Sequence, residues 1–178
     1  MAEPTNFSDK YGRLEQTATT SRIVFERILH QPSAKVWKAI TIPKKISQWL
    51  SPNHHASNTK LDLKVGGAVS LQLMMANIHG TITKLESKTL LEIEFPNNII
   101  IRWELYEINA NKCKLVFINE FPTGQSISTD FIPAITGWHV YMDFLEITLS
   151  GAGITLFDPK DWNDISRSLT SSYHNLIT

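Results

Sequence analysis

Hydrophobic and polar residues alternate through much of the chain, most clearly between residues 61 and 120. Successive side chains on a strand point to opposite faces of a sheet, so this alternation predicts strands with one buried face. The expected strands are 22–29, 61–64, 69–74, 78–85, 90–95, 99–106 and 112–120, with turns such as Gly66-Gly67 and Asn97-Asn98 between them. This close spacing is typical of an antiparallel meander.

The same alternation assigns the two faces of the predicted sheet. The inner positions are Val69, Leu71, Leu73, Leu91, Ile93, Phe95, Ile101, Trp103, Leu105, Leu115 and Phe117. The outer positions are Arg102, Glu104, Tyr106, Lys114 and Glu120. Because the inner set is apolar, we expect another layer of the protein to cover it.

A long helix over residues 133–149 is the predicted cover, since Ile135, Trp138, Met142, Leu145 and Leu149 recur at helical spacing. Two shorter helices are expected after the first strand, one capped by Ser33 and one opened by Pro43. A last helix is predicted at 158–176, where Trp162, Ile165, Leu169 and Tyr173 form one stripe.

These elements predict a single α+β domain over residues 21–178, with the 158–176 helix as a C-terminal extension. We expect a curved antiparallel sheet of about six or seven strands wrapped around the long helix, with the two short helices after the first strand. Residues 1–20 are mostly polar and are predicted to form a loosely ordered N-terminal arm.

Seventeen basic residues balance seventeen acidic ones, so the chain has no net charge with which to attract nucleic acid. The absence of a long apolar run argues against a signal segment and against membrane insertion. The single cysteine, Cys113, cannot form an internal disulfide, which suits a reducing compartment. We therefore expect a cytoplasmic protein.

Glycine-rich phosphate loops, nucleophile elbows and paired-cysteine motifs are missing from the sequence, so it predicts no cofactor and no catalytic residue. His54 and His55 are adjacent but have no third ligand at metal spacing. A metal site would need His79 or an acidic residue brought in by the fold. The prediction is a solvated loop without metal.

His139 and Asp143 are spaced i, i+4 on the predicted long helix. A carboxylate at this spacing can orient an imidazole for acid–base catalysis. It can equally form an ordinary contact on the helix surface. With no nucleophile motif nearby, the sequence favours the surface contact.

Aromatic and flexible side chains are expected to converge between the sheet and the long helix, where they can line a ligand cavity. The candidates from the strand and helix patterns are Trp49, Leu71, Phe95, Trp103, Phe117, Trp138 and Met142. For any one of these residues, plain core packing is the simpler interpretation; the cavity is predicted from the set as a whole. Trp103→Ala is expected to weaken ligand binding more than a change on the outer face.

Several strings, in order along the chain, resemble one known family. They are Tyr-Gly-Arg-Leu-Glu at 11–15, Phe-Glu-Arg at 25–27, Val-Trp-Lys-Ala-Ile-Thr at 36–41, Pro43, Trp49, Asp62, Gly66-Gly67, Gly80, Gly137-Trp138, Trp162 and Tyr173. The set resembles the SRPBCC (START-like, helix-grip) superfamily, in the bacterial branch similar to the C-terminal domain of the activator of the heat-shock protein 90 ATPase. Lys64, Phe95 and Asn119 depart from the residues usual there, and Asn119 joins the candidate cavity residues on this basis.

The resemblance implies a helix-grip fold and a binding role more than catalysis. Our first hypothesis is a small apolar or amphipathic ligand held between the sheet and the long helix. The alternatives are an interaction protein of chaperones or the stress response, and an enzyme of the cyclase or hydratase kind that uses the same cavity. The chain is expected to be a monomer or a weak homodimer.

Overall fold

The computed structural model describes residues 10–52, 58–74, 76–122, 124, 127–152, 154 and 159–177. The strands are β1 (Arg13–Gln16), β2 (Thr20–Leu29), β3 (Lys60–Leu61), β4 (Ala68–Gln72), β5 (Asn77–Glu86), β6 (Leu90–Phe95), β7 (Ile99–Asn109) and β8 (Lys112–Pro122). The helices are α1 (Ser33–Thr41), α2 (Pro43–Leu50), α3 (Ile132–Ser150) and α4 (Pro159–Ile177), with a short 3-10 turn η2 (Pro96–Asn98) and a π-helical turn η3 (Ile127–Phe131).

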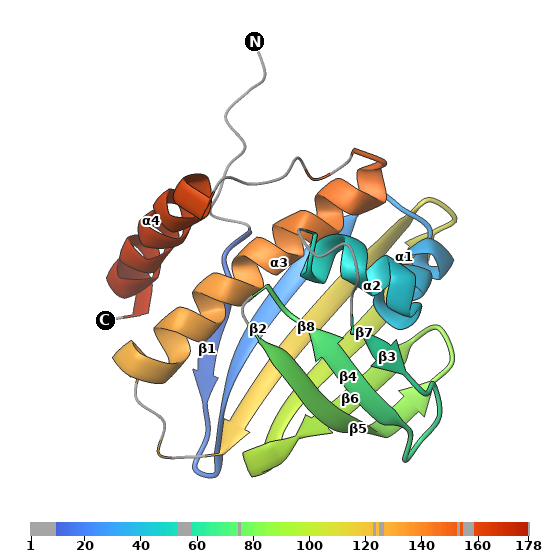
Figure 1. Ribbon diagram of the computed structural model, residues 1–178, viewed down its shortest axis with the longest axis horizontal. Coiled ribbons are helices and arrows are strands. Elements are labelled where there is room, and N and C mark those ends of the chain that lie inside the picture. The colour runs from blue at the N-terminus through green and yellow to red at the C-terminus, as the bar shows by residue number, and fades with distance from the viewer. Residues whose placement is uncertain are drawn as a thin grey trace.

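The strands form one antiparallel sheet in the order β1-β2-β8-β7-β6-β5-β4-β3, and α3 lies across its concave face (Figure 1). The predicted helix-grip arrangement is confirmed, with two short helices after β2 and a long helix in the grip of the sheet. The sheet has eight strands, which is more than the six or seven expected.

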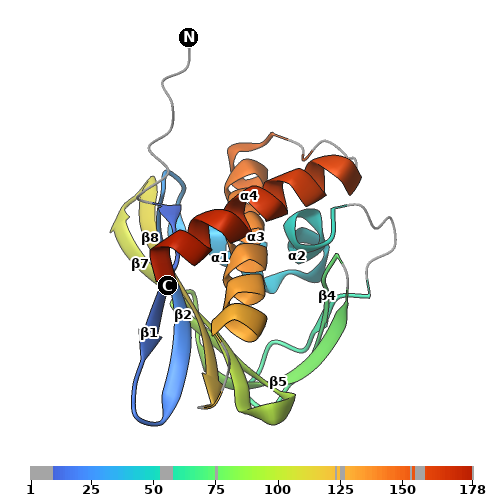
Figure 2. The same ribbon diagram turned by 90° about the vertical axis from the view of Figure 1, so that its left-hand side faces the viewer.

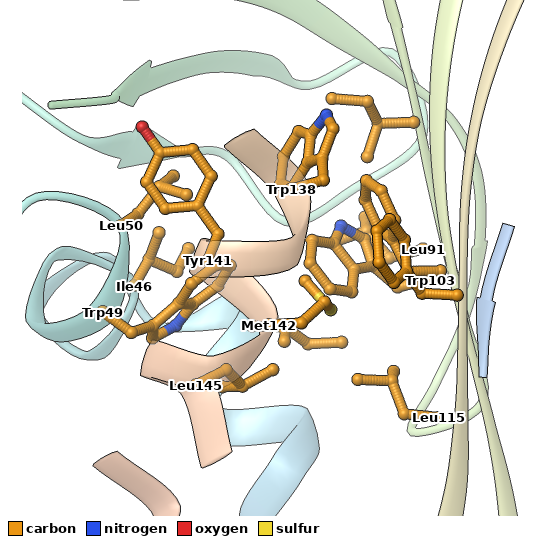
Figure 3. Close-up of a cluster of buried hydrophobic side chains, with 14 of the residues drawn as sticks. Ile46, Trp49, Leu50, Leu91, Trp103, Leu115, Trp138, Tyr141, Met142 and Leu145 are labelled. Carbon is orange, nitrogen blue, oxygen red and sulfur yellow. The ribbon is translucent and has the colours of Figure 1, made fainter. Parts of the chain in front are cut away.

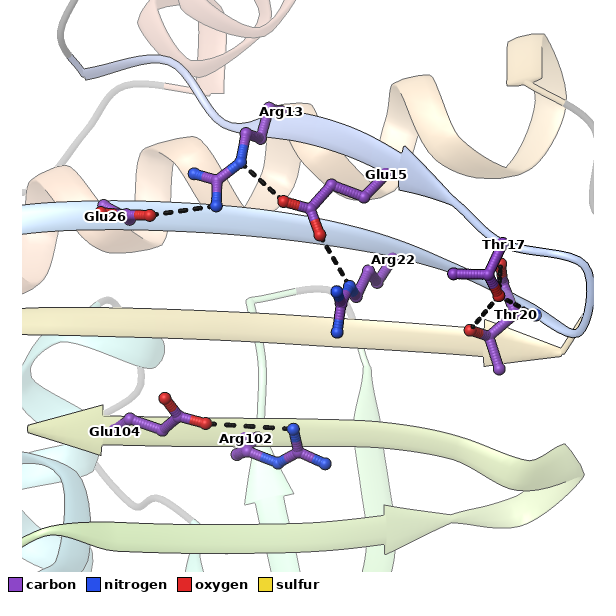
Figure 4. A network of polar contacts seen from close by, with 8 residues as sticks. All are labelled: Arg13, Glu15, Thr17, Thr20, Arg22, Glu26, Arg102 and Glu104. Carbon is purple, nitrogen blue, oxygen red and sulfur yellow. Dashed lines mark hydrogen bonds and ion pairs between the residues drawn. The ribbon is translucent and has the colours of Figure 1, made fainter.

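The additional strand is β1, which pairs with β2 in the register Arg13↔Val24 to Gln16↔Ser21. The prediction that residues 1–20 form a loose arm is therefore wrong for this segment; residues 1–9 lie outside the described residues. The four-residue strand contains one apolar side chain, so it shows no alternation to detect. Ion pairs Arg13–Glu26 at 3.0 Å and Arg22–Glu15 at 2.7 Å help to hold it on β2 (Figure 4).

The face assignment from the alternation is correct. All the predicted inner residues are buried in the main core except Leu73, which is partly buried against it. The outer face carries the charged and polar side chains, including the pairs drawn in Figure 4. Val24, Val116 and Ile118 form a small separate apolar cluster on that face.

Helix α3 is buried on nearly all sides, because the sheet, α2 and α4 each cover part of it (Figure 2). An aromatic cluster links it to the sheet: the ring centroids are 4.5 Å apart for Trp103–Phe117 and 4.3 Å apart for Phe117–Trp138. Trp49 of α2 meets Trp103 edge-on at 5.7 Å, and its indole nitrogen donates to the Ala39 carbonyl at 3.0 Å. This cluster fixes the position of α3 in the sheet.

A buried polar cluster joins α3 to α4 and to the start of β1. The Gly12 backbone N–H donates to the Tyr173 hydroxyl at 2.9 Å, and that hydroxyl lies 2.7 Å from His139 Nδ1. His139 Nε2 is 3.6 Å from Asp143 Oδ2. Since the hydroxyl accepts from Gly12, its proton is available for His139 Nδ1, which leaves the imidazole proton on Nε2, facing Asp143.

The prediction that His139 and Asp143 form a solvated surface contact is wrong, because His139 is only 1% exposed. Helical spacing places both residues on one face of α3, but α4 and β1 cover that face in the folded chain. Tyr11 and Tyr173 enclose the imidazole edge-on, at centroid distances of 5.2 and 5.8 Å. The imidazole therefore belongs to the core, on a different face of α3 from Trp138, while the Asp143 side chain beside it is 37% exposed.

The environment of His139 disfavours its charged form. Arg27 of β2, 3% exposed in its side chain, pairs with Glu146 at 3.0 Å and faces Asp143 at 3.7 Å, while Lys10 also pairs with Glu146. Burial, and then the positive charges of Arg27 and Lys10, lower the pKa of His139 from 6.5 to about 4. The imidazole of His139 is therefore neutral near pH 7. Burial also raises the pKa values of Asp143 and Tyr173, which keeps the Tyr173 phenol protonated.

Truncating the centre of the aromatic cluster should destabilise the whole fold. Trp103→Ala removes a side chain that is 4% exposed and should lower the free energy of unfolding by about 4 kcal/mol, measured by urea denaturation. Tyr106→Ala, on the exposed side of the same strand, is the control and should change it by no more than about 0.5 kcal/mol. A loss below about 1 kcal/mol for Trp103→Ala would contradict the role of this cluster.

The buried imidazole should make stability fall as the solution is acidified. The unfolded chain takes up a proton at His139 near pH 6.5 and the folded chain only near pH 4, so stability is lost as pH falls through this interval. Between pH 7 and pH 5 the loss should be about 2 kcal/mol, before most carboxylates titrate. Asp143 opposes this loss of stability, because its pKa is raised in the folded chain and its protonation therefore favours folding as the pH falls.

Urea unfolding at a series of pH values measures this slope. His139→Gln should be less stable at pH 7 but should lose the slope between pH 7 and pH 5. Asp143→Asn should keep a slope at least as steep as that of the unmodified protein, because it removes the opposing group. An unchanged slope in His139→Gln would show that another group titrates.

Candidate functional site

A cavity of about 590 Å³ lies between the sheet and the first half of α3. Its size is within the range that accommodates a small organic ligand. The described lining residues come from the β4–β5 connection, β5 to β8, η2 and α3: Leu73, Asn77, Ile78, His79, Phe95, Pro96, Ile99, Ile101, Asn119, Phe121, Pro133, Ala134, Gly137, Trp138 and Tyr141.

Helix α3 presents one stripe of residues to this cavity, from Pro133 to Tyr141. Gly137 lies in the middle of the stripe, and a Cβ atom built on it would have no other atom within 4 Å. The helix therefore leaves open space where most residues would place a side chain. Two large residues that follow Gly137 along the helix, Trp138 and Tyr141, form part of the wall.

The described part of the cavity wall is mainly apolar. Phe95, Phe121, Trp138 and Tyr141 give it aromatic surfaces. Among the described lining residues there is no Asp, Glu, Lys or Arg. The polar groups Asn77 and His79 are exposed, so they stand at the rim.

Two neutral polar groups lie inside the cavity wall. Asn119 is 4% exposed; its Oδ1 accepts from Trp138 Nε1 at 3.1 Å and its Nδ2 donates to the Ile100 carbonyl at 3.2 Å. Because an indole N–H can only donate, this pair fixes which way the amide points. The Tyr141 hydroxyl accepts from the Met74 backbone N–H at 3.2 Å, and burial raises the pKa of Tyr141, which keeps the phenol protonated.

The structure separates the residues predicted for the cavity into two groups. Phe95, Asn119 and Trp138 line it. Trp49, Leu71, Trp103, Phe117 and Met142 are instead packed in the core beside it, as Figure 3 shows for Trp49, Trp103 and Met142. In that view the α2 residues lie on one side of α3 and the sheet residues on the other.

Sequence reasoning missed Tyr141, Gly137 and Phe121 as lining residues. Tyr141 follows Trp138 by three positions, so helical periodicity could have found it. Gly137 was noted as part of a family string but not as a gap in the helix surface. Phe121 lies beyond the predicted end of the last strand, because β8 continues to Pro122.

The remaining candidate residues from the sequence are the His139–Asp143 pair and the adjacent His54 and His55. His139 and Asp143 do not line it. His54 and His55 lie outside the described residues. Within the described parts of the chain, no group of three or more His, Cys, Asp or Glu residues could hold a metal ion. A search of those same parts found no helix long and apolar enough to cross a bilayer.

Solved structures share this fold at low sequence identity. A conserved protein of unknown function from Enterococcus faecalis, EF2215, is 19% identical with a TM-score of 0.70, and the match covers 94% of this chain and 92% of that one. CalU16 from Micromonospora echinospora, in its crystal structure, is 20% identical with a TM-score of 0.67 and coverages of 93% and 94%. The Aha1 dimer from Colwellia psychrerythraea is 16% identical, with a TM-score of 0.58 and coverages of 72% and 95%.

No curated protein matches the chain in sequence. A family model does match, and its description is Activator of Hsp90 ATPase homolog 1-like protein. The match spans residues 30–150, from the end of β2 to the end of α3, and so includes the cavity-lining residues. The chain is thus a member of the Activator of Hsp90 ATPase homolog 1-like family, within the SRPBCC superfamily of helix-grip proteins.

Proposed function

We propose that this protein binds a small apolar or amphipathic molecule in the cavity between the sheet and α3. The observation that carries the proposal is Gly137, whose position in the helix leaves the cavity open. Four aromatic side chains surround this space, and the buried Asn119 amide offers a polar contact inside it. An apolar pocket with few fixed polar groups is the usual form of a small-molecule site.

The energetics of Gly137 support a functional rather than a structural reason for the gap. Glycine inside a helix is about 1 kcal/mol less favourable than alanine. A Cβ atom here meets nothing within 4 Å, so packing does not require glycine. Its φ is not in the left-handed region either, since the positive-φ glycines of the described chain are Gly66, Gly124 and Gly151.

The second candidate function is an interaction with a chaperone, and it rests on the family description alone. This candidate function predicts that the protein binds purified heat-shock protein 90 of the same cell and changes the ATPase rate of that chaperone. An unchanged rate together with no complex in a pull-down would remove this candidate.

We do not extend the proposal to acid–base catalysis in the cavity. That chemistry needs titrating groups that face the ligand. Among the described lining residues His79 is the one histidine, and no carboxylate is present.

Free and buried Cys113 fits a reducing compartment such as the cytoplasm, where we place the protein.

Filling the gap at Gly137 should block ligand binding without harming the fold. Gly137→Leu places a side chain in the cavity and should weaken binding of the neutral dye phenylnaphthylamine by at least about tenfold, measured by fluorescence titration. Gly137→Ala should raise the free energy of unfolding by up to about 1 kcal/mol and leave dye binding nearly unchanged.

Ser168→Leu is the matched control, because it adds the same side chain at an exposed position of α4. It should leave the dye affinity at its original value. If Gly137→Leu is folded and binds the dye as well as the control does, the cavity is not the binding site.

A further inference from the structure

The described lining of the proposed ligand site has polar groups but no carboxylate, lysine or arginine, and this restricts which molecules it can hold. The described wall contains no acidic or basic side chain apart from His79 at the exposed rim. A charged group moved into such a wall loses its hydration and gains no partner. The interior therefore discriminates by charge, even between molecules of the same shape.

The Asn119 amide supplies a directed contact at the inner wall. An amide nitrogen carries two N–H groups, and one of them donates to the Ile100 carbonyl. The amide cannot rotate freely, since its oxygen is held by Trp138 Nε1 at 3.1 Å. The second N–H is thus a fixed donor in a buried wall, which matches an acceptor oxygen on a ligand.

The Tyr141 hydroxyl adds a second donor on the same lining. It accepts from the Met74 backbone, so its own proton remains available for another acceptor. Its raised pKa keeps that proton in place near neutral pH. The aromatic walls, with Trp138 and Tyr141 edge-on at 5.5 Å, present flat surfaces to ring systems.

We infer that the cavity takes an uncharged aromatic molecule that carries an acceptor oxygen, such as a ketone or a phenol ether. This inference rests on the ligand-binding function proposed above. Asn119 is the residue that selects for this oxygen. Fatty acids and other anions of similar size are excluded from the interior because their charged group finds no partner there.

A first pair of probes tests the exclusion of charge. Phenylnaphthylamine and anilinonaphthalene sulfonate share one ring skeleton and differ by the sulfonate. The neutral dye should bind at least about tenfold more tightly to the unmodified protein, and Gly137→Leu should weaken that binding by at least about tenfold. Equal affinities that Gly137→Leu reduces equally would overturn the charge exclusion while leaving ligand binding itself intact. No binding of either dye would remove the proposed function and this inference together.

A second pair tests the role of Asn119. Fluorenone and fluorene have the same flat ring system, and only fluorenone has an acceptor oxygen. The unmodified protein should bind fluorenone at least about fivefold more tightly, by isothermal titration calorimetry. Asn119→Leu replaces the amide with an apolar side chain of similar size, and Asn119→Ala removes the amide altogether; both lack the donor and should abolish the preference for fluorenone.

Asn163→Leu is the matched control, because it makes the same substitution at an exposed position of α4 that does not line the cavity. It should keep the fluorenone preference. Thermal melting of each variant establishes that it is folded, and the two Asn119 variants differ enough that one remains usable if the other unfolds. A preference that survives in either folded Asn119 variant would overturn the assignment of this residue.

Discussion

The contact between α3 and the concave face of the sheet is the interaction on which the rest of the structure depends. Trp138 of the helix packs on Phe117 of β8 at 4.3 Å, and Phe117 in turn packs on Trp103 of β7. This contact buries the apolar face of the sheet and sets the distance between helix and strands. Toward its C-terminal half α3 is packed closely, and toward its N-terminal half the same geometry leaves the cavity.

The other face of α3 is fixed by polar contacts rather than by rings alone. Tyr173 reaches from α4 to His139 and to the Gly12 backbone, so one hydroxyl connects both ends of the described chain to the central helix. Buried Arg27 balances Glu146 and Asp143 beside it. Helix α3 is thereby held from two sides, and the cavity wall at Trp138 rests on a helix with little freedom to shift.

The pattern of residues predicted much of this fold. Alternation identified the inner face of the sheet, and helical spacing identified α3 and α4. Of the stripe predicted on α4, Tyr173 is buried but Ile165 is 37% exposed. The strand β1 escaped prediction because its sequence has one apolar residue, so no alternation marks it as a strand. His139 was placed at the surface because the sequence shows its spacing from Asp143 but not that α4 and β1 cover it.

The sequence by itself determined which side chains are apolar, on which face of each element they lie, and that sheet and helix must meet. Only the tertiary structure decided which of those side chains fill the interior and which border open space. Trp103 and Trp138 have the same chemistry and both lie on inner faces, yet one is packed in the core and the other lines the cavity. The physical reason is that a cavity depends on the distance between elements, and Gly137 opens it only because α3 crosses the sheet at that point.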